Sequence, residues 1–185
     1  TVLPMSDLFR FTTVILAGGL GTRLRKVVPD CPKVLAEING KPFLCHILDQ
    51  LANAGINQVI ISTGYLARMV EEAIGTSYKG LLVNYSREEA PLGTAGALKL
   101  AGQDTDTEYC LVMNGDSYTE FEPISLFMSH NQYNADITLL VKMASDTSRF
   151  GTIQMNDQNE IVRFVEKENS STAGLINAGI YIMKT

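Results

Sequence analysis

Five short apolar runs, separated by segments of helical periodicity, restrict the fold of this chain more than any other feature of its sequence. The runs are continuous and lie at 14–17, 59–61, 81–83, 109–113 and 137–141. Uninterrupted runs of this length are typical of strands that are buried on both faces of a sheet. Between them, apolar residues recur at helical spacing over 43–51, 66–74, 98–101 and 126–130. This alternation predicts an α/β fold with a Rossmann-like, mixed but mainly parallel sheet and helices on both faces.

The pattern changes after Asp146. Residues 150–155 and 161–166 flank the turn residues 156–159 and predict an inserted β-hairpin, and 176–183 predicts a last strand. Ligands of such sheets bind beyond the carboxyl ends of the strands. We therefore expect the site just after Ala17, Ser62, Tyr85 and Met113.

Composition and charge exclude several classes of protein. The chain has 185 residues, 45% of them hydrophobic and 19% charged, which excludes intrinsic disorder. No apolar run approaches the roughly 20 residues of a membrane span. The formal net charge of −5 argues against a broad nucleic-acid surface. The segment 23–41 nevertheless holds five basic and two acidic residues, a surplus of three positive charges that suits a small anion.

The cysteines and histidines indicate no chemistry of their own. Cys31, Cys45 and Cys110 are odd in number and lack metal-ligand spacing, which favours a reducing, cytoplasmic setting over a disulfide framework. His46 is predicted to pack within a helical apolar pattern, and His130 to interact with a helix end.

A glycine-rich loop follows the first predicted strand. The backbone amides that could face a phosphate are those of Leu16, Ala17, Gly18, Gly19, Gly21 and Thr22. Glycines let such amides approach a phosphate, and Arg23 and Lys33 add positive charge. The loop does not match the dinucleotide-binding fingerprint, because Leu24 stands where its third glycine would be and no acidic residue ends the second predicted strand. It does not match a Walker phosphate-binding loop either, because Pro42 follows Gly40-Lys41 where that motif requires Ser or Thr. The alternative to a phosphate-binding loop is a tight turn whose basic side chains are simply solvated.

Several motifs in order resemble those of one enzyme family. Gly18 to Leu24 with Pro32-Lys33, the segment 89–97 and Asn114-Gly115-Asp116 resemble the sugar-1-phosphate nucleotidylyltransferases. Around Gly151, Glu166-Lys167 and Asn177 the chain resembles the sugar-side motifs of the same family. The likeness spans 14–183 and is closest to the heptose-1-phosphate and mannose-1-phosphate guanylyltransferases.

The resemblance implies a fold, a reaction and a set of site residues. The fold would be that of the nucleotide-diphospho-sugar transferases. The enzyme would transfer a nucleoside monophosphate, with GMP favoured, from the triphosphate to a heptose- or mannose-type sugar 1-phosphate and release pyrophosphate. It would use Mg²⁺ on Asp116. Its expected site residues are catalytic Arg23, Lys33 and Asp116; nucleotide-binding Leu16, Ala17, Gly18, Gly19, Gly21, Thr22, Glu88, Gly93 and Thr94; and sugar-phosphate-binding Gly151, Glu166, Lys167 and Asn177.

Some features allow other interpretations. Asp116 also fits a β-turn, Glu166-Lys167 a cross-strand ion pair, Gly151 a bulge, and Thr94 a helix cap. The family's second metal-binding aspartate lies beyond the last motif, so we expect a single domain over 11–185 that lacks its C-terminal end, after an N-terminal extension or foreign residues at 1–10.

The alternative functions are a non-catalytic nucleotide-sugar binding or regulatory domain, and a uridylyl- or thymidylyltransferase acting on another sugar. A nicotinamide-dependent oxidoreductase is disfavoured by Leu24. The expected setting is cytoplasmic biosynthesis of lipopolysaccharide or capsule polysaccharide. The expected partners are GTP and the sugar 1-phosphate, with neither nucleic acid nor membrane, and a homo-oligomer is allowed.

Overall fold

The structure is a computed structural model that describes residues 11–19, 31–103, 105, 107–166 and 172–185. The strands are β1 (Phe11–Leu16), β2 (Glu37–Ile38), β3 (Lys41–Pro42), β4 (Gln58–Thr63), β5 (Ser77–Tyr78), β6 (Leu81–Arg87), β7 (Tyr109–Asn114), β8 (Ile137–Ala144), β9 (Thr152–Met155), β10 (Ile161–Val165) and β11 (Gly174–Lys184). The helices are the 3-10 turn η3 (Lys33–Leu35), α1 (Phe43–Asn53), α2 (Ala67–Ile74), α3 (Gly93–Gly102) and α4 (Pro123–Gln132). Contacts divide the chain into two compact units, Leu139–Ile180 and the remainder.

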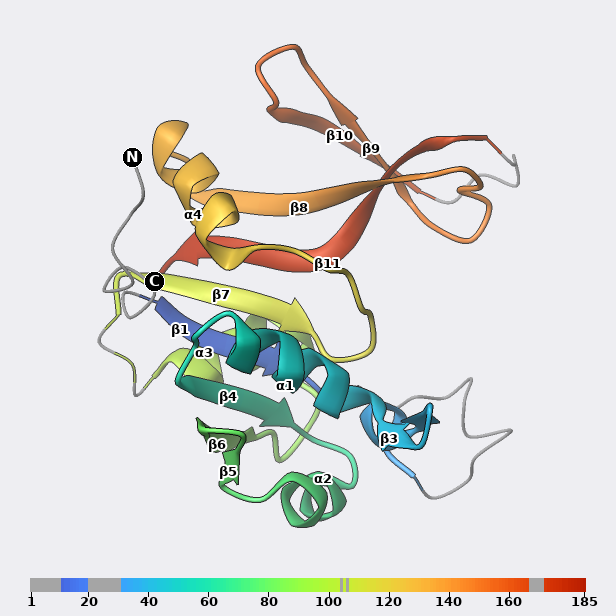
Figure 1. The fold of residues 1–185 in the computed structure, drawn as a ribbon. Helices are drawn as coiled ribbons and strands as arrows, with labels where there is room; N and C mark the ends of the chain where they lie inside the picture. The colour runs from blue at the N-terminus through green and yellow to red at the C-terminus, as the bar shows by residue number, and fades with distance from the viewer. Residues whose placement is uncertain (1–10, 20–30, 104, 106, 167–171) are drawn as a thin grey trace. The chain divides into compact units, whose positions relative to one another are not determined.

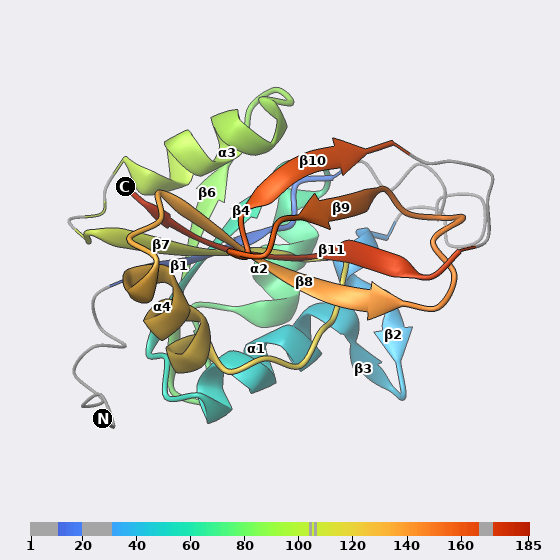
Figure 2. The ribbon, with the colours of Figure 1, turned by 90° about the horizontal axis from the view of Figure 1, so that it is seen from above.

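The larger unit is built on a mostly parallel sheet. Its strands follow the order β11-β7-β1-β4-β6-β5, and the part of β11 in this unit begins at Tyr181. The strand β1 runs parallel to β4 and β7, β4 runs parallel to β6, and the short β5 is antiparallel to its neighbour β6. Helix α3 covers one face of this sheet, and α1 and α4 cover the other (Figures 1 and 2).

Alternation along the central strands explains why both faces are covered. Val14, Cys110 and Val112 pack with Ala101 of α3 in one buried cluster. The intervening residues point to the opposite face, where the rings of Phe11 and Tyr109 contact Phe127 of α4. Both sets are apolar, so the strands form continuous apolar runs.

The smaller unit consists of β-structure. The strand β9 is antiparallel to β10 and to β11, and β8 pairs with β11. The pairing of β10 with β9 has a register shift between Ile161 and Arg163, as at a β-bulge. This unit contains the hairpin that the sequence predicts over 150–166, with its turn between β9 and β10.

The predicted order of strands and helices is confirmed, with two corrections. The strands β6 and β8 are not buried on both faces: Leu82 of β6 is 50% exposed, and Ile137 and Met143 of β8 are 58% and 64% exposed. A strand that is covered on one face only can still carry apolar residues on the other, so run length does not separate the two cases. The short elements η3, β2, β3 and β5 have no periodicity that predicts them.

Candidate active site

The site begins where three parallel strands end at the same level. Leu16 of β1 lies opposite Ser62 of β4 and Asn114 of β7 in the sheet register. Main-chain hydrogen bonds continue past this level, from the amide of Ala17 to Ser62 O at 2.8 Å and from the amide of Gly115 to Leu16 O at 2.8 Å. The loops that follow the three strands therefore leave the sheet side by side, as expected for a ligand site at a carboxyl edge.

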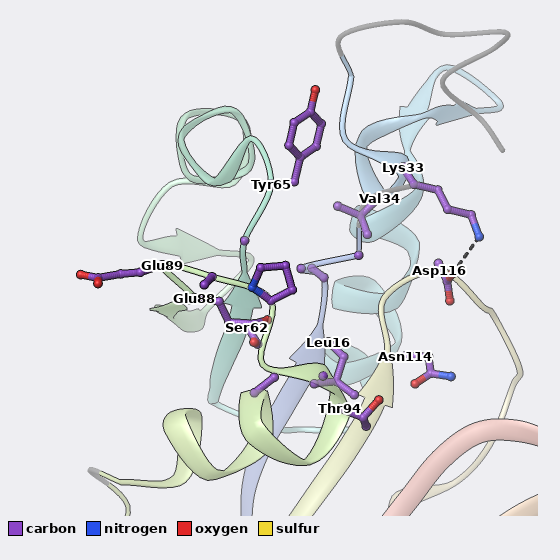
Figure 3. A pocket seen from close by; sticks show the side chains of 18 residues that line it. Leu16, Lys33, Val34, Ser62, Tyr65, Glu88, Glu89, Thr94, Asn114 and Asp116 are labelled. Carbon is purple, nitrogen blue, oxygen red and sulfur yellow. Dashed lines mark hydrogen bonds and ion pairs between the residues drawn. The ribbon is translucent and has the colours of Figure 1, made fainter. Parts of the chain in front are cut away.

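A cavity of about 990 Å³ opens above this edge (Figure 3). Nine of the residues predicted to bind nucleotide or to act in catalysis line it: Leu16, Ala17, Gly18, Gly19, Lys33, Glu88, Gly93, Thr94 and Asp116. Several further lining residues are not among the site residues expected from the sequence: Val34, Ser62, Gly64, Tyr65, Ala90, Pro91, Ala97 and Asn114. The position of Tyr65, shortly after the end of β4 at Thr63, agrees with the expectation that the site follows the strand ends. The hydroxyl of Ser62 is buried and has no hydrogen-bond partner within the described part of the chain.

Lys33 and Asp116 form an ion pair in the cavity. Lys33 opens η3 after Pro32, and Asp116 comes two residues after β7. The ammonium Nζ lies 2.7 Å from Asp116 Oδ2, and Figure 3 shows the two side chains pointing toward one another. Both side chains are nearly half exposed. Because an exposed ion pair contributes only about 0–1 kcal/mol, a charged ligand can replace it at little cost.

Gly115 allows β7 to end close to its neighbours. A Cβ at this position would lie 2.8 Å from Leu16 O and 3.3 Å from a methyl of Val34. The first contact is with backbone, which cannot move aside as a flexible side chain can. The glycine thus lets Asp116 follow the strand immediately and reach Lys33.

Glu88 links the glycine loop to the start of α3. Its amide donates to Thr63 O at 2.8 Å, and its Oε2 accepts from the amide of Leu92 at 2.9 Å. Its other carboxylate oxygen lies 2.6 Å from where a Cβ on Gly18 would be, so only glycine fits there unless Glu88 moves. Leu92 is the N-cap of α3, without a side-chain capping bond, so the alternative interpretation of Thr94 as the cap is wrong.

The remaining predicted residues lie elsewhere or are not described. Gly21, Thr22, Arg23 and Lys167 fall outside the described residues. Gly151, Glu166 and Asn177 belong to or border the strands of the smaller unit. There a Cβ on Gly151 would lie 3.1 Å from Val165 O, and Asn177 Oδ1 accepts a hydrogen bond from the amide of Gly179 at 2.7 Å. Their contact with a sugar phosphate stays a prediction.

The donor set at Asp116 fits a magnesium ion that is shared with phosphates. Mg²⁺ prefers oxygen ligands and is usually held by one or two carboxylates together with substrate phosphates. Asp116 supplies an accessible carboxylate, and the side-chain amide of Asn114 lies in the same cavity. Within the described ranges no three His, Cys, Asp or Glu side chains group around a metal position. Among the described residues, Asp116 would hold the ion.

Comparison with known proteins identifies the family. The sequence profile of the nucleotidyl transferase family matches residues 12–185. This chain belongs to that family. Among relatives, a D-glycero-alpha-D-manno-heptose 1-phosphate guanylyltransferase of Aneurinibacillus thermoaerophilus is 43% identical over 169 residues, which cover 91% of this chain and 73% of the relative.

Other members of the family agree with this assignment. A mannose-1-phosphate guanylyltransferase of Mycobacterium tuberculosis is 35% identical over 172 residues, or 92% of this chain and 48% of that protein. The crystal structure of HddC from Yersinia pseudotuberculosis, also solved in complex with GMP-PN, superposes with a TM-score of 0.85 at 32% identity, covering 94% of this chain and 76% of HddC. The resemblance and the fold class expected from the motifs are thus confirmed. In the described part of this family member, no helix has the length and apolar character of a membrane span.

Proposed function

We propose that this protein transfers GMP from GTP to a sugar 1-phosphate of the heptose or mannose type. An oxygen of the sugar phosphate bonds to the α-phosphorus of GTP, the bond from that phosphorus to the β-phosphate oxygen breaks, and pyrophosphate leaves. The carrying observation is the cavity in which the Gly18-Gly19 backbone, Lys33 and Asp116 converge. The guanylyltransferase relatives support the choice of guanine and of these sugars.

The reaction needs charge neutralisation above all, because both substrates are anions that repel each other. In the proposal the amides of the glycine loop and Arg23 hold the triphosphate, and Lys33 offsets charge on the reacting phosphate. Mg²⁺ bound at Asp116 would supply further positive charge to the phosphate oxygens. In the free protein Lys33 is paired with Asp116, and the substrate phosphates and Mg²⁺ would replace this pairing.

Guanine selection is proposed to lie in the connection between β6 and α3. Gly93 and Thr94 line the cavity at the start of α3, and Glu88 holds the amide of Leu92 in the same connection. Backbone and carboxylate groups at such a place can read the donor and acceptor pattern of a base edge. Gly151, Glu166, Lys167 and Asn177 are proposed to bind the sugar phosphate.

The proposal also places the reaction in the cytoplasm, in the supply of activated sugars for lipopolysaccharide or capsule. Free Cys31, Cys45 and Cys110 support a reducing compartment. We propose a catalytic domain over 11–185 that acts on small substrates, with or without assembly into a homo-oligomer.

Pyrophosphate release tests the function directly. The purified protein is incubated with Mg²⁺, each of the four common ribonucleoside triphosphates and dTTP, and the 1-phosphates of D-glycero-α-D-manno-heptose, mannose and glucose. The nucleotide sugar is identified by mass spectrometry. We expect GDP-heptose or GDP-mannose as the main product. Preference for UTP or dTTP would support a different base, and binding of a nucleotide sugar without turnover of any pair would support a non-catalytic domain.

A further inference from the structure

The segment that carries Lys33 has little structure of its own to hold it. Between residue 31 and the start of α1 it contains η3 and the strands β2 and β3, which pair only with each other in a separate two-stranded sheet. An isolated hairpin is marginally stable in water. The position of the Lys33 ammonium therefore depends on contacts that other elements make with η3 and with this hairpin.

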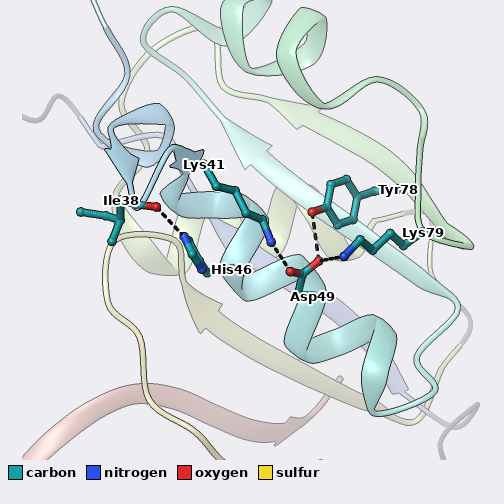
Figure 4. A network of polar contacts seen from close by, with 6 residues as sticks. All are labelled: Ile38, Lys41, His46, Asp49, Tyr78 and Lys79. Carbon is teal, nitrogen blue, oxygen red and sulfur yellow. Dashed lines mark hydrogen bonds and ion pairs between the residues drawn. The ribbon is translucent and has the colours of Figure 1, made fainter.

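Helix α1 makes two such contacts from one of its faces. His46 and Asp49 lie three residues apart, which puts them on the same side of the helix. His46 Nε2 donates to Ile38 O at 3.0 Å, since a carbonyl oxygen only accepts. Asp49 Oδ2 forms an ion pair with Lys41 Nζ (Figure 4). Ile38 and Lys41 are cross-strand partners in the hairpin, so α1 holds both of its strands at the same register position.

Asp49 is a stronger anchor than an isolated surface carboxylate. Its Oδ1 also accepts from the hydroxyl of Tyr78 at 3.0 Å and lies 2.9 Å from Lys79 Nζ (Figure 4). Partial burial acts to raise the pKa of Asp49, but the hydrogen bonds from Lys41, Lys79 and Tyr78 outweigh it and lower the pKa to about 2. The carboxylate is charged at every working pH, and several partners share it, which is the case in which surface charges stabilise a structure measurably.

The hairpin is coupled closely to the reactive lysine. The amide of Phe43, at the start of α1, donates to Ala36 O at 2.9 Å, and the amide of Ala36 donates to Lys33 O at 3.2 Å. Val34, the residue that follows Lys33, is buried, with 3% of its surface exposed. A shift of the hairpin along α1 would therefore move the backbone of Lys33 and change where its ammonium lies relative to Asp116.

We propose that Asp49, together with His46, is a positioning residue for nucleotidyl transfer: it holds the hairpin 37–42 on α1 and so keeps Lys33 in place beside Asp116 and the phosphates. Asp49 takes no part in the chemistry and acts through Lys33. This inference depends on the proposed function only for its kinetic consequences, because the hold on the hairpin is a property of the free protein.

The kinetic test compares Asp49→Asn with a matched control. Since small misplacements of a reacting group can cost up to about 100-fold in rate, we expect kcat to fall roughly 10- to 100-fold while KM for GTP changes less than about twofold. Lys41→Gln, which removes the partner on the hairpin, should do the same. Lys79→Gln removes another partner of the same carboxylate without touching the hairpin, so its kcat should match the wild type.

A double mutant separates positioning from general loss of structure. In the Lys33→Ala background, Asp49→Asn should lower the residual rate no further, because the group that it positions is already gone. An unchanged kcat in Asp49→Asn, or the same fold-loss with and without Lys33, would overturn the proposal.

Hydrogen exchange tests the tether without any substrate. In Asp49→Asn and Lys41→Gln the amides of Leu35, Ala36 and Phe43, followed by NMR, should exchange about 10-fold faster than in the wild type, and in Lys79→Gln they should not. Equal exchange in all proteins would refute the tether even if the enzyme is active. Absence of wild-type turnover would instead refute the proposed function and leave the exchange result to decide the tether.

Discussion

At the scale of single residues, the site depends on two side chains that arrive from loops 83 positions apart in the chain. Lys33 follows Pro32 at the start of a single 3-10 turn, and Asp116 follows Gly115 just beyond β7. Neither residue is conspicuous alone, since surface lysines and turn aspartates are common. Their 2.7 Å contact inside the cavity is what makes them candidates for chemistry.

Removing either charge should lower turnover while the fold survives. We expect Lys33→Ala to reduce kcat roughly 10²–10³-fold, the usual effect of removing one group that stabilises transition-state charge. Asp116→Ala should cost several kcal/mol of transition-state stabilisation by deleting the magnesium ligand. Steady-state kinetics with circular dichroism as a check on folding measures both. Near-normal rates in both variants would contradict the assigned roles.

Gly115→Ala should destabilise the protein through a backbone clash. Its Cβ would lie 2.8 Å from Leu16 O, so β1 and β7 must separate, and overpacking of this kind costs about 1–3 kcal/mol. Gly102→Ala is the matched control, because a Cβ there meets nothing within 4 Å and alanine favours the helix α3. Urea unfolding of the two variants and the wild type measures the change in the free energy of unfolding. A Gly115→Ala protein as stable as the control would show that the strands yield freely.

At the scale of elements, α4 shows how a buried polar residue is accommodated. His130 is 1% exposed, contacts the ring of Tyr109 edge-on and has its Nδ1 2.8 Å from the hydroxyl of Thr138. The sequence predicted only an interaction with the helix end. Burial, with a smaller effect of Lys184, lowers the pKa of His130, and Asp136 acts in the opposite direction.

The free energy of unfolding should therefore decrease as the pH falls through about 6.5 and below. The unfolded chain binds a proton at His130 near the ordinary pKa of about 6.5, whereas the folded chain resists it, so acid favours unfolding. His130→Gln should flatten this dependence between pH 8 and pH 5, measured by urea unfolding at each pH. If the free energy of unfolding of His130→Gln depends on pH as steeply as that of the wild type, another group causes the pH dependence.

At the scale of the whole molecule, the charge distribution complements the proposed substrates. The net charge is −5, yet the segment 23–41 has a surplus of three positive charges, and it includes Lys33 at the cavity. The parallel strands bring the ends of β1, β4 and β7 to one edge, and Gly18, Gly19 and Lys33 line the same cavity there, so they can act on the same ligand. Long-range repulsion of anions by the rest of the chain is then offset locally.

GTP should stabilise the folded protein by mass action. At a concentration 100 times its Kd, it adds about 2.7 kcal/mol to the free energy of unfolding, which thermal denaturation detects as a higher Tm.

We expect Arg23→Ala to weaken GTP binding more than binding of the sugar 1-phosphate, since the arginine is assigned to the triphosphate. Equal losses of affinity for GTP and for the sugar 1-phosphate in calorimetric titrations would contradict the assignment of Arg23 to the triphosphate.

Local patterns were enough to predict the alternation of strands and helices. The apolar runs that became β1, β4 and β7 are continuous because helices cover both faces of those strands, and the helices α1 and α2 carry the 3.6-residue spacing of a single buried face. The glycine loop and Asn114-Gly115-Asp116 could be placed after strands, so the edge that carries the cavity was predictable as well.

Tertiary structure alone decided which polar groups meet. The partners of Asp49 come from the hairpin β2–β3 and from the residues around β5, elements too short to have a periodicity of their own. His46, predicted to pack, instead donates to Ile38 O. The sequence by itself determined the longer elements, because burial repeats at the period of each element, and its motifs determined the family. Contacts between side chains distant in the chain depend on how those elements pack, and that packing has no local sequence signal.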